Sequence, residues 1–481
     1  MHPSPFSTPS ATHLRNLDLE YARQRKPRPN WQVGIVFVCL VALNVTPIRD
    51  SAGGALACLS ALICVFNPFA TFLYVAGSQI APDPSGFPFT LAQLFVVAWV
   101  VTLPFNGCAR HLTAAFQGLR YSLVFIVLWT VIGIANQTID EPIAYAFIAA
   151  AILSTYLPKV SGDETSLLLM LALGCLIGVA GYWGTAIGIS MEGEVYEHAS
   201  RGGTRMGSGR ADVNFASVNI GFGLWTLIAL LLPTAWMQNQ KNQTTAKFLI
   251  VVVFVACALP LVAMGSRAGL GYLILGGVSL LLYSLNTHLL AGAAQRYALI
   301  VTAVVIFVLP FIWPNLLETK PGQMLLATLE YNSVQSQGLG SGTAAAGRQE
   351  IWQKFYDIAI QYPFFGAPKN SVVDMGEYGV AIIGVAGSQG GTGHNFFLDL
   401  AAGHGIPIAF LFVITFIAPV IVLLARRGAL YTMPFVIAHA MVLLPFLNLS
   451  ILNWKTYWAL HVITAYAACK SVRINKNVPS A

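Results

Sequence analysis

The stretch GIPIAFLFVITFIAPVIVLLARR, which runs from Gly405 to Arg427, decides the class of fold. It carries no charged side chain over residues 405–425, and two arginines follow at once. An apolar segment of about 20 residues is long enough to cross the hydrocarbon core of a bilayer as a helix. Arginines beside such a segment are typical of its cytoplasmic end. The stretch therefore predicts a transmembrane helix of known orientation.

Similar apolar stretches recur along nearly the whole chain. Of its 481 residues, 56% are hydrophobic and only 9% are charged, whereas soluble domains carry about 25% charged residues. The candidate spans lie near residues 32–48, 52–66, 67–81, 88–105, 120–137, 142–158, 165–183, 213–233, 247–265, 268–286, 297–313, 405–425, 429–448 and 451–469. Because the second and third are short, we expect 12 to 14 transmembrane helices. The predicted fold class is all-α, a polytopic helical bundle in a membrane.

Basic residues predict the orientation of this bundle. Five of them precede the first span: Arg15, Arg23, Arg25, Lys26 and Arg28. The positive-inside bias therefore puts the amino terminus in the cytoplasm. Alternation of the spans puts Arg426, Arg427 and Lys470 on the same side, and the carboxy terminus with them. The opposite face receives two long loops, residues 184–212 and 314–394. This topology explains the net charge of +7 without nucleic acid as a partner.

Metal and nucleotide chemistry have no signature in the sequence. The seven cysteines lie in or beside apolar segments, so we predict neither a disulfide framework nor a cysteine metal site. The long loops contain no His-Glu-x-x-His or Asp-x-Asp arrangement, and no phosphate-binding loop or dinucleotide fingerprint occurs. We therefore expect no metal and no cofactor.

Several arginines are expected on the outer face, against the topological bias. Arg205 and Arg210 lie in a glycine-rich stretch that runs into the next span at Asn214, and Arg267 stands in a tight break between two spans. Guanidinium groups bind phosphate oxygens bidentately, and a helix start with small residues leaves N–H groups open to an anion. These segments predict a phosphate or diphosphate site. A basic loop attracted to anionic lipid, with Arg267 snorkelling to the headgroups, is the alternative.

The second outer loop contains a predicted helix and a histidine. Residues 349–360 have a helical pattern with Trp352 on the apolar stripe, and Pro363 ends it. The loop closes with GGTGHN, residues 390–395, directly before an apolar run. Such a histidine, His394, is a candidate general base near neutral pH. A hydrogen-bonded structural histidine is the alternative.

Four segments, taken in order, resemble the O-antigen ligase and O-antigen polymerase family. They are Arg205 with Asn214; Gly265-Ser266-Arg267-Ala268-Gly269; Gly347-Arg348-x-x-x-Trp352 with Pro363-x-x-Gly366; and His394-Asn395-x-x-Leu398 with Gly405 downstream. The resemblance covers about residues 180–425 by motif and the remainder by hydropathy. The chain departs from the family pattern at Val213, where proline is usual, which bears on the local turn more than on the chemistry.

The resemblance implies a helical membrane glycosyltransferase of the GT-C type, on the periplasmic side of a bacterial inner membrane. Its donor would be a glycan on undecaprenyl diphosphate. Its acceptor would be lipid A–core in a ligase, or another lipid-linked glycan in a polymerase. The enzyme would contact membrane lipid throughout.

The resemblance also implies roles for particular residues. His394 would activate the acceptor hydroxyl. Arg205 and Arg267 would hold the diphosphate, and Arg348 would assist from the loop. The other residues expected to bind substrate are Arg210, Asn214 and Asn395.

We expect four parts in the chain. They are a cytoplasmic tail (1–30), an amino-terminal transmembrane bundle (31–183), a ligase-like catalytic region (184–425), and carboxy-terminal helices with a cytoplasmic tail (426–481). Two alternatives stay open: a protein O-oligosaccharyltransferase of the same family, and a transporter of lipid-linked sugars or small solutes. A transporter would carry buried charges or broken helices at mid-membrane, whereas most spans here lack ionisable residues at their centres.

Overall fold

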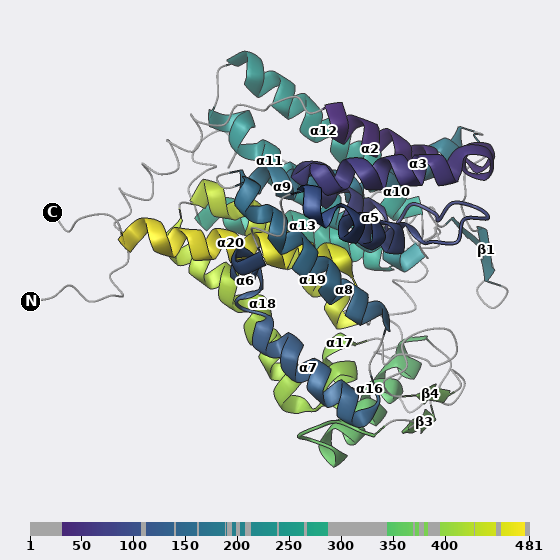
Figure 1. Ribbon diagram of the computed structural model, residues 1–481, viewed down its shortest axis with the longest axis vertical. Coiled ribbons are helices and arrows are strands. Elements are labelled where there is room, and N and C mark those ends of the chain that lie inside the picture. Colours follow the sequence, from purple (N-terminus) through teal and green to yellow (C-terminus); the bar gives the residue numbers. More distant parts are fainter. Residues whose placement is uncertain are drawn as a thin grey trace, which may run out of the picture.

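The computed structural model describes residues 31–106, 112–138, 141–160, 163–187, 189, 195–198, 203–206, 213–237, 240–263, 267–286, 344–368, 371–374, 380–382, 395–427, 429–448 and 454–476. These residues are almost entirely helical, which confirms the all-α polytopic bundle predicted from the sequence (Figure 1). Only short strands interrupt the helices.

The part of the chain before the first outer loop contains α2 (Trp31–Ala42), α3 (Thr46–Phe66), α4 (Pro68–Gly77), α5 (Leu91–Asn106), α6 (Leu112–Leu119), α7 (Leu123–Asn136), α8 (Glu141–Tyr156), the 3-10 turn η2 (Leu157–Val160), α9 (Glu164–Cys175) and α10 (Ile177–Ala186). The later part contains α11 (Val213–Met237), α12 (Gln240–Ala263), α13 (Arg267–Asn286), α16 (Ala344–Gln361), α17 (Phe396–His404), α18 (Ile406–Arg426), α19 (Ala429–Asn448) and α20 (Lys455–Lys476).

Two antiparallel hairpins lie in the loops, and the sequence analysis does not predict them. Strand β1 (Val195–His198) pairs with β2 (Gly203–Met206), and β3 (Val372–Asp374) pairs with β4 (Val380–Ile382). Both hairpins are very short, so hydrophobic alternation gives little signal for them.

The predicted spans agree with helices throughout the described part of the chain; residues 297–313 lie outside it. Six helical segments there are long and apolar enough to cross a membrane, and shorter apolar helices accompany them. Boundaries shift by several residues, as at α3, which begins at Thr46. The total of 12 to 14 spans stays a prediction.

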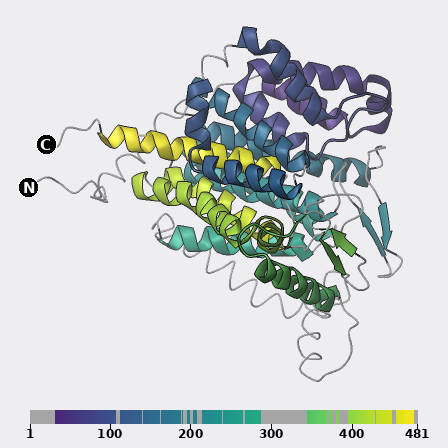
Figure 2. The ribbon, with the colours of Figure 1, turned by 60° about the horizontal axis from the view of Figure 1, so that its bottom comes forward.

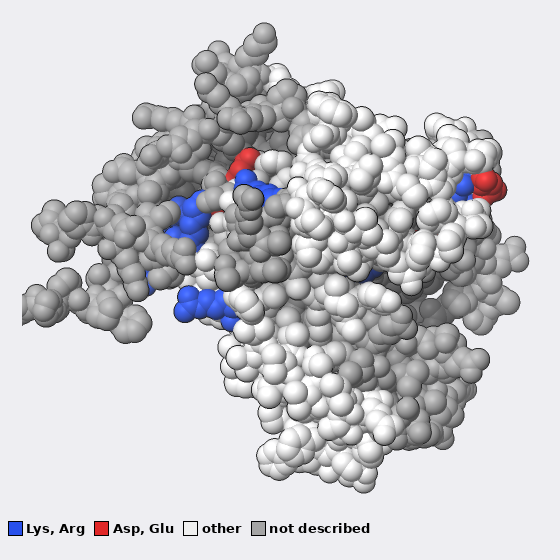
Figure 3. Space-filling model, viewed as in Figure 1, with Lys and Arg blue, Asp and Glu red and all other residues white. Residues whose placement is uncertain are grey.

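The two ends of the bundle differ. The last turns of α20 lie at one end, whereas both hairpins lie at the other in two views 60° apart (Figures 1 and 2). On the face drawn in Figure 3, described Lys and Arg side chains gather mainly at the end where α20 finishes. This distribution agrees with the expected cytoplasmic end, and the absolute orientation stays a prediction.

A buried ion pair joins three helices at the end where α20 finishes. Glu164, at the start of α9, is 3% exposed and accepts a hydrogen bond from Lys470 of α20 at 3.3 Å. The hydroxyl of Tyr431, in α19, donates to the other carboxylate oxygen at 3.2 Å. Arg427 lies over the Tyr431 ring, 5.1 Å from its centre. A charge at this depth needs such partners.

Removal of Lys470 tests this pair. Breaking a buried ion pair by deleting one partner costs about 3–5 kcal/mol of stability. Because the Lys470 side chain is 27% exposed, we expect the stability lost in Lys470→Ala to be at or below the lower end of that range. Glu164→Gln added to Lys470→Ala should recover much of the loss, measured as thermal unfolding in detergent. Asp50→Asn, in a pair where Asp50 is 52% exposed, is the control and should leave the melting temperature nearly unchanged. A Lys470→Ala protein as stable as the control would contradict this account.

Candidate functional site

The third and fourth motif segments pack against each other. Phe355 of α16 forms a small apolar cluster with Ala367 and Ala402, and Ile358 and Leu398 pack beside it. The predicted helix 349–360 is confirmed as the larger part of α16, and its apolar stripe faces α17. Arg348 and Asn395 are therefore carried by two helices of one packed unit.

Glycines hold this unit together through a close crossing of two backbones. Gly366 has a φ of +73°, and a Cβ there would lie 2.3 Å from the Gly403 carbonyl carbon. Gly405 has a φ of +95°, and its Cβ would lie 2.3 Å from the carbonyl oxygen of Phe364. Only glycine adopts such angles cheaply and leaves that space empty. Backbone conformation and close packing thus explain why glycine stands at these two motif positions.

Backbone hydrogen bonds stabilise the crossing on both sides. The Ala367 N–H donates to the Ala402 carbonyl at 2.7 Å, and the Ile406 N–H donates to the Pro363 carbonyl at 2.8 Å. We call residues 363–367 with 402–406 the glycine crossing. It fixes the end of α16 to the α17–α18 junction.

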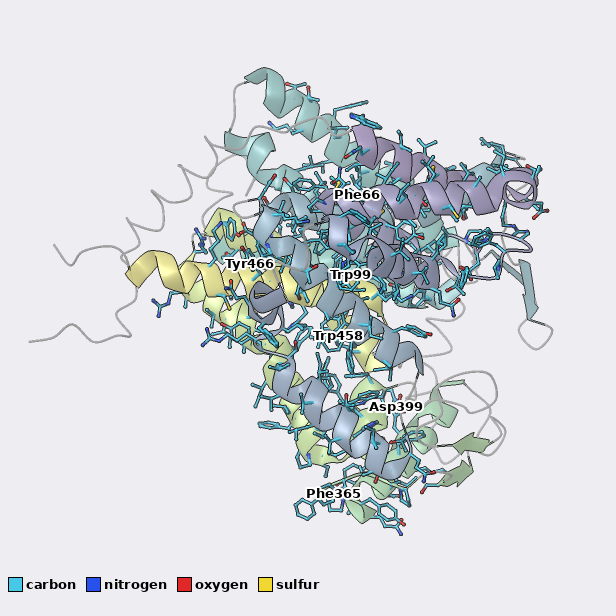
Figure 4. All side chains as sticks on the ribbon, in the orientation of Figure 1. Phe66, Trp99, Phe365, Asp399, Trp458 and Tyr466 are labelled. Atoms are coloured by element: carbon cyan, nitrogen blue, oxygen red, sulfur yellow. The ribbon has the colours of Figure 1, made fainter. Side chains whose placement is uncertain are left out.

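The glycine crossing is also tied to the transmembrane bundle. The side-chain amide of Asn136, at the end of α7, donates to the Phe365 carbonyl at 2.6 Å. The His404 ring stacks on Trp129 of α7, with 5.1 Å between ring centres. Figure 4 shows Phe365 beside the end of α7 and Asp399 further into the molecule. The outer-loop unit is thus joined to a membrane helix.

Asn395 caps α17. Its side-chain oxygen accepts hydrogen bonds from the N–H groups of Phe397 at 3.1 Å and Leu398 at 3.2 Å. Asparagine is among the best residues for this purpose. The cap uses only the Asn395 side-chain oxygen, and a substrate contact of its amide nitrogen stays a prediction. His394 precedes it in the chain and lies outside the described residues.

The helix that carries Asn214 of the first motif and the helix that begins with Arg267 of the second also interlock. Asn214 is the second residue of α11, and Arg267 is the first residue of α13. Inside the pair, the Trp225 indole N–H donates to the Tyr272 carbonyl at 2.8 Å. A Cβ on Gly221 would meet the Tyr272 ring at 2.3 Å. The two helix starts are therefore held in a fixed relation.

Gly269 of the second motif serves close packing. A Cβ at Gly269 would lie 2.5 Å from the Leu261 carbonyl oxygen near the end of α12. The glycine therefore lets the first turn of α13 approach α12, next to Arg267. The expectation that small residues here leave N–H groups open to an anion stays a prediction, since Gly265 and Ser266 lie outside the described residues.

The starts of α11 and α17 lie at one end of the bundle. Near the start of α11, the Asn219 side-chain oxygen accepts a hydrogen bond from the Trp454 indole N–H at 3.2 Å, just before α20. Phe396, the first residue of α17, packs on Phe446 near the end of α19, with ring centres 4.9 Å apart. Phe446 in turn meets Tyr457 in the first turn of α20 at 5.0 Å. Helix starts carry partial positive charge, so the starts of α11 and α17 each favour a nearby anion, whereas the end of α19 does not.

The remaining predicted site residues are placed less fully. Arg205 stands on β2 opposite Tyr196, in a hairpin at the end of the molecule away from the last turns of α20 (Figures 1 and 2). Arg210 lies outside the described residues. The side-chain positions of Arg205, Arg267 and Arg348 are likewise outside the description. Their convergence on one substrate stays a prediction.

The sequence analysis does not single out two histidines that are buried in the structure. His439 of α19 is 4% exposed and His461 of α20 is fully buried. Among the residues that the structure describes, no hydrogen-bond partner is found for either ring nitrogen of His461 or for His439 Nε2. A single histidine within an apolar run gives no indication in the sequence that it will lie near another histidine. Within the described ranges, no group of three His, Cys, Asp or Glu side chains gathers as a metal site.

These features define a polytopic helical membrane protein in which α16, from the second long loop, packs onto the helical bundle. Residues 250–413 match the model of the O-antigen ligase family, about a third of the chain. The match includes three of the four motif segments and confirms the resemblance over that stretch. It indicates a membrane glycosyltransferase of the O-antigen ligase type. No curated protein matches the chain.

Substitution of Gly366 tests the glycine crossing. A non-glycine residue with positive φ costs about 1–2 kcal/mol, and Gly366→Ala also pushes a methyl group into the backbone of residues 403 and 404. We expect Gly366→Ala to lose more than about 2 kcal/mol of stability. Gly86 is the matched control, because it has a φ of +66° with nothing within 4 Å of a Cβ. Equal losses in the two variants would show that the crossing is loose.

Two substitutions at Asn395 separate capping from substrate binding. Asn395→Ala should cost about 1 kcal/mol of stability through the lost cap, whereas Asn395→Asp keeps the cap. Because the resemblance implies a substrate contact, we expect Asn395→Asp to be stable but slower in glycan transfer. A stable and fully active Asn395→Asp would confine Asn395 to capping.

Proposed function

We propose that this protein transfers a glycan from undecaprenyl diphosphate to an acceptor hydroxyl, on the periplasmic face of a bacterial inner membrane. The observation that carries the proposal is the O-antigen ligase match over residues 250–413, which contains Arg267, Arg348 and His394. The packed unit of α16 and α17 supports it, because it joins the segments that carry Arg348 and His394.

The first chemical requirement is stabilisation of the leaving group. When the bond from the anomeric carbon to the diphosphate oxygen breaks, the diphosphate gains negative charge. Arg205 and Arg267 supply fixed positive charge for it, and Arg348 assists from α16. Arginine stays charged in a partly apolar site and binds phosphate oxygens bidentately. Such preorganised charge lowers the barrier without a metal ion.

The second requirement is a base for the attacking hydroxyl. His394 accepts the hydroxyl proton as the new glycosidic bond forms, while the diphosphate leaves with the bonding electrons. An imidazole has the right basicity near neutral pH. One displacement from the opposite side inverts the anomeric centre. The proposed reaction is therefore a metal-independent, inverting transfer.

Variants of His394 and Arg267 test this mechanism. Loss of a general base typically costs about 10²–10⁴-fold in rate, and loss of a charge stabiliser about 10²–10³-fold. We expect His394→Ala and Arg267→Ala to show such losses in a transfer assay with lipid-linked glycan, and EDTA to leave the wild-type rate unchanged. Arg120→Ala is the control, because Arg120 is exposed at the predicted cytoplasmic end. Folded variants with full activity, or inhibition by EDTA, would refute the mechanism.

The acceptor is a separate question, which a gene deletion addresses. A ligase predicts that no glycan reaches the lipopolysaccharide core, whereas a polymerase predicts core with a single repeat. A normal lipopolysaccharide pattern would favour a protein hydroxyl or an exopolysaccharide as acceptor. We put lipid A–core or a lipid-linked glycan first, since the matched family is named for O-antigen.

A transporter is the second candidate function. The buried His439 and His461 favour it, because ionisable groups within spans often mark a substrate path. The family match favours the enzyme. Uptake into vesicles, measured beside transfer in detergent, separates the two: a transporter moves substrate across the membrane but makes no new glycosidic bond.

A further inference from the structure

The turn that ends α16 presents large apolar side chains to the surroundings. Phe364 and Phe365 are each 68% exposed, and Tyr362 is 36% exposed. The backbone of these residues is held by hydrogen bonds in and beside the glycine crossing. The three side chains therefore project from a rigid turn. We call residues 362–365 the aromatic turn. Exposed aromatic residues in one turn mark an interaction surface.

The aromatic turn is continuous with apolar surfaces of α7, one of the shorter apolar helices, and of α18. On α7, Val131 and Ile134 are exposed, and the Phe365 carbonyl accepts from Asn136 at the end of that helix. On α18, one of the six candidate spans, Phe410 and Ile414 are exposed just beyond the junction with the turn. Among the described residues, Figure 3 shows no Lys, Arg, Asp or Glu side chain over this lower part of the drawn face. Exposed apolar residues on a spanning helix face lipid.

Helix α16 has both polar and apolar side chains on its exposed surface. Near its middle, exposed Gln353 donates a hydrogen bond to Asp357, one turn further on, at 2.9 Å. Toward its end, Ile360 is 53% exposed and leads into the aromatic turn. An 18-residue helix is about 27 Å long. The exposed apolar side chain of the last turn is therefore suited to lipid, whereas Gln353 and Asp357 are suited to water.

We propose that the aromatic turn and the end of α16 insert into the outer lipid–water interface of the bilayer. The occupant is lipid, because the patch continues the lipid-facing surfaces of α7 and α18. Amphipathic helices bury an apolar face about 5–10 Å into the headgroup and acyl boundary. The turn then fixes the height of α16, and of Arg348 near its other end, relative to the bilayer. This consequence for Arg348 rests on the proposed function, whereas the insertion itself does not.

A fluorescent label tests the insertion. An environment-sensitive dye is attached at Phe365→Cys, or at Gln353→Cys as the matched control on the same helix. Both variants lack Cys58, the exposed member of the described cysteines, and Cys108, which lies outside the described residues. In vesicles containing phospholipid with a nitroxide on the upper acyl chain, we expect quenching at position 365 to exceed that at position 353 by at least about twofold. Equal quenching, or none at position 365, would overturn the proposal.

A second variant keeps the test independent of the label. Phe364→Ser with Phe365→Ser leaves the backbone contacts in place and removes the apolar surface. In lipid nanodiscs we expect transfer from the membrane-bound donor to fall about tenfold or more, since small displacements of catalytic groups are costly. Quenching at position 365 without any glycan transfer by the wild type would support insertion and refute the proposed function. A double variant with wild-type transfer would refute the link between insertion and activity.

Discussion

The arrangement of the outer face depends on two backbones that cross without side chains between them. At the crossing, Gly366 and Gly405 adopt positive φ and lie against the backbone of residues 403–404 and 364. A close crossing of this kind leaves no room for slippage, because any added carbon collides with a carbonyl group. It therefore joins α16, the described helix of the second long loop, firmly to α7 and α18. Without it, α16 would be free to move relative to the start of α17.

This rigidity matters because transfer chemistry requires preorganised charge. Arginines on mobile loops would have to be ordered at each turnover, whereas arginines at the starts of packed helices are positioned in advance. Helix α13, which begins with Arg267, interlocks with α11 through Trp225 and Tyr272. Helix α17 is capped by Asn395 and packs on α16. The fold thus contains two rigid units, α11 with α13 and α16 with α17, and both contact α19.

Sequence alone predicts the helices, which have a periodic or continuous apolar pattern. It does not predict features that depend on a single contact between distant residues. The spans follow from long apolar runs, and α16 follows from its stripe and from Pro363. The motif residues are recognisable by type and order. The glycine crossing is not predictable, because its partners Gly366 and Gly405 are far apart in the chain and leave no periodic signal. The hairpin that carries Arg205 is too short to show alternation, and the capping role of Asn395 depends on where α17 begins.

Under the proposed function, the arginines and His394 surround one diphosphate at the predicted outer end of the bundle. An experimental structure of the protein with bound undecaprenyl diphosphate is the sharpest test of this arrangement. We expect diphosphate oxygens within about 2.7–3.2 Å of the guanidinium groups of Arg205 and Arg267, with His394 facing the same site. Diphosphate density at the end where Lys470 lies, or at a site without these arginines, would contradict it.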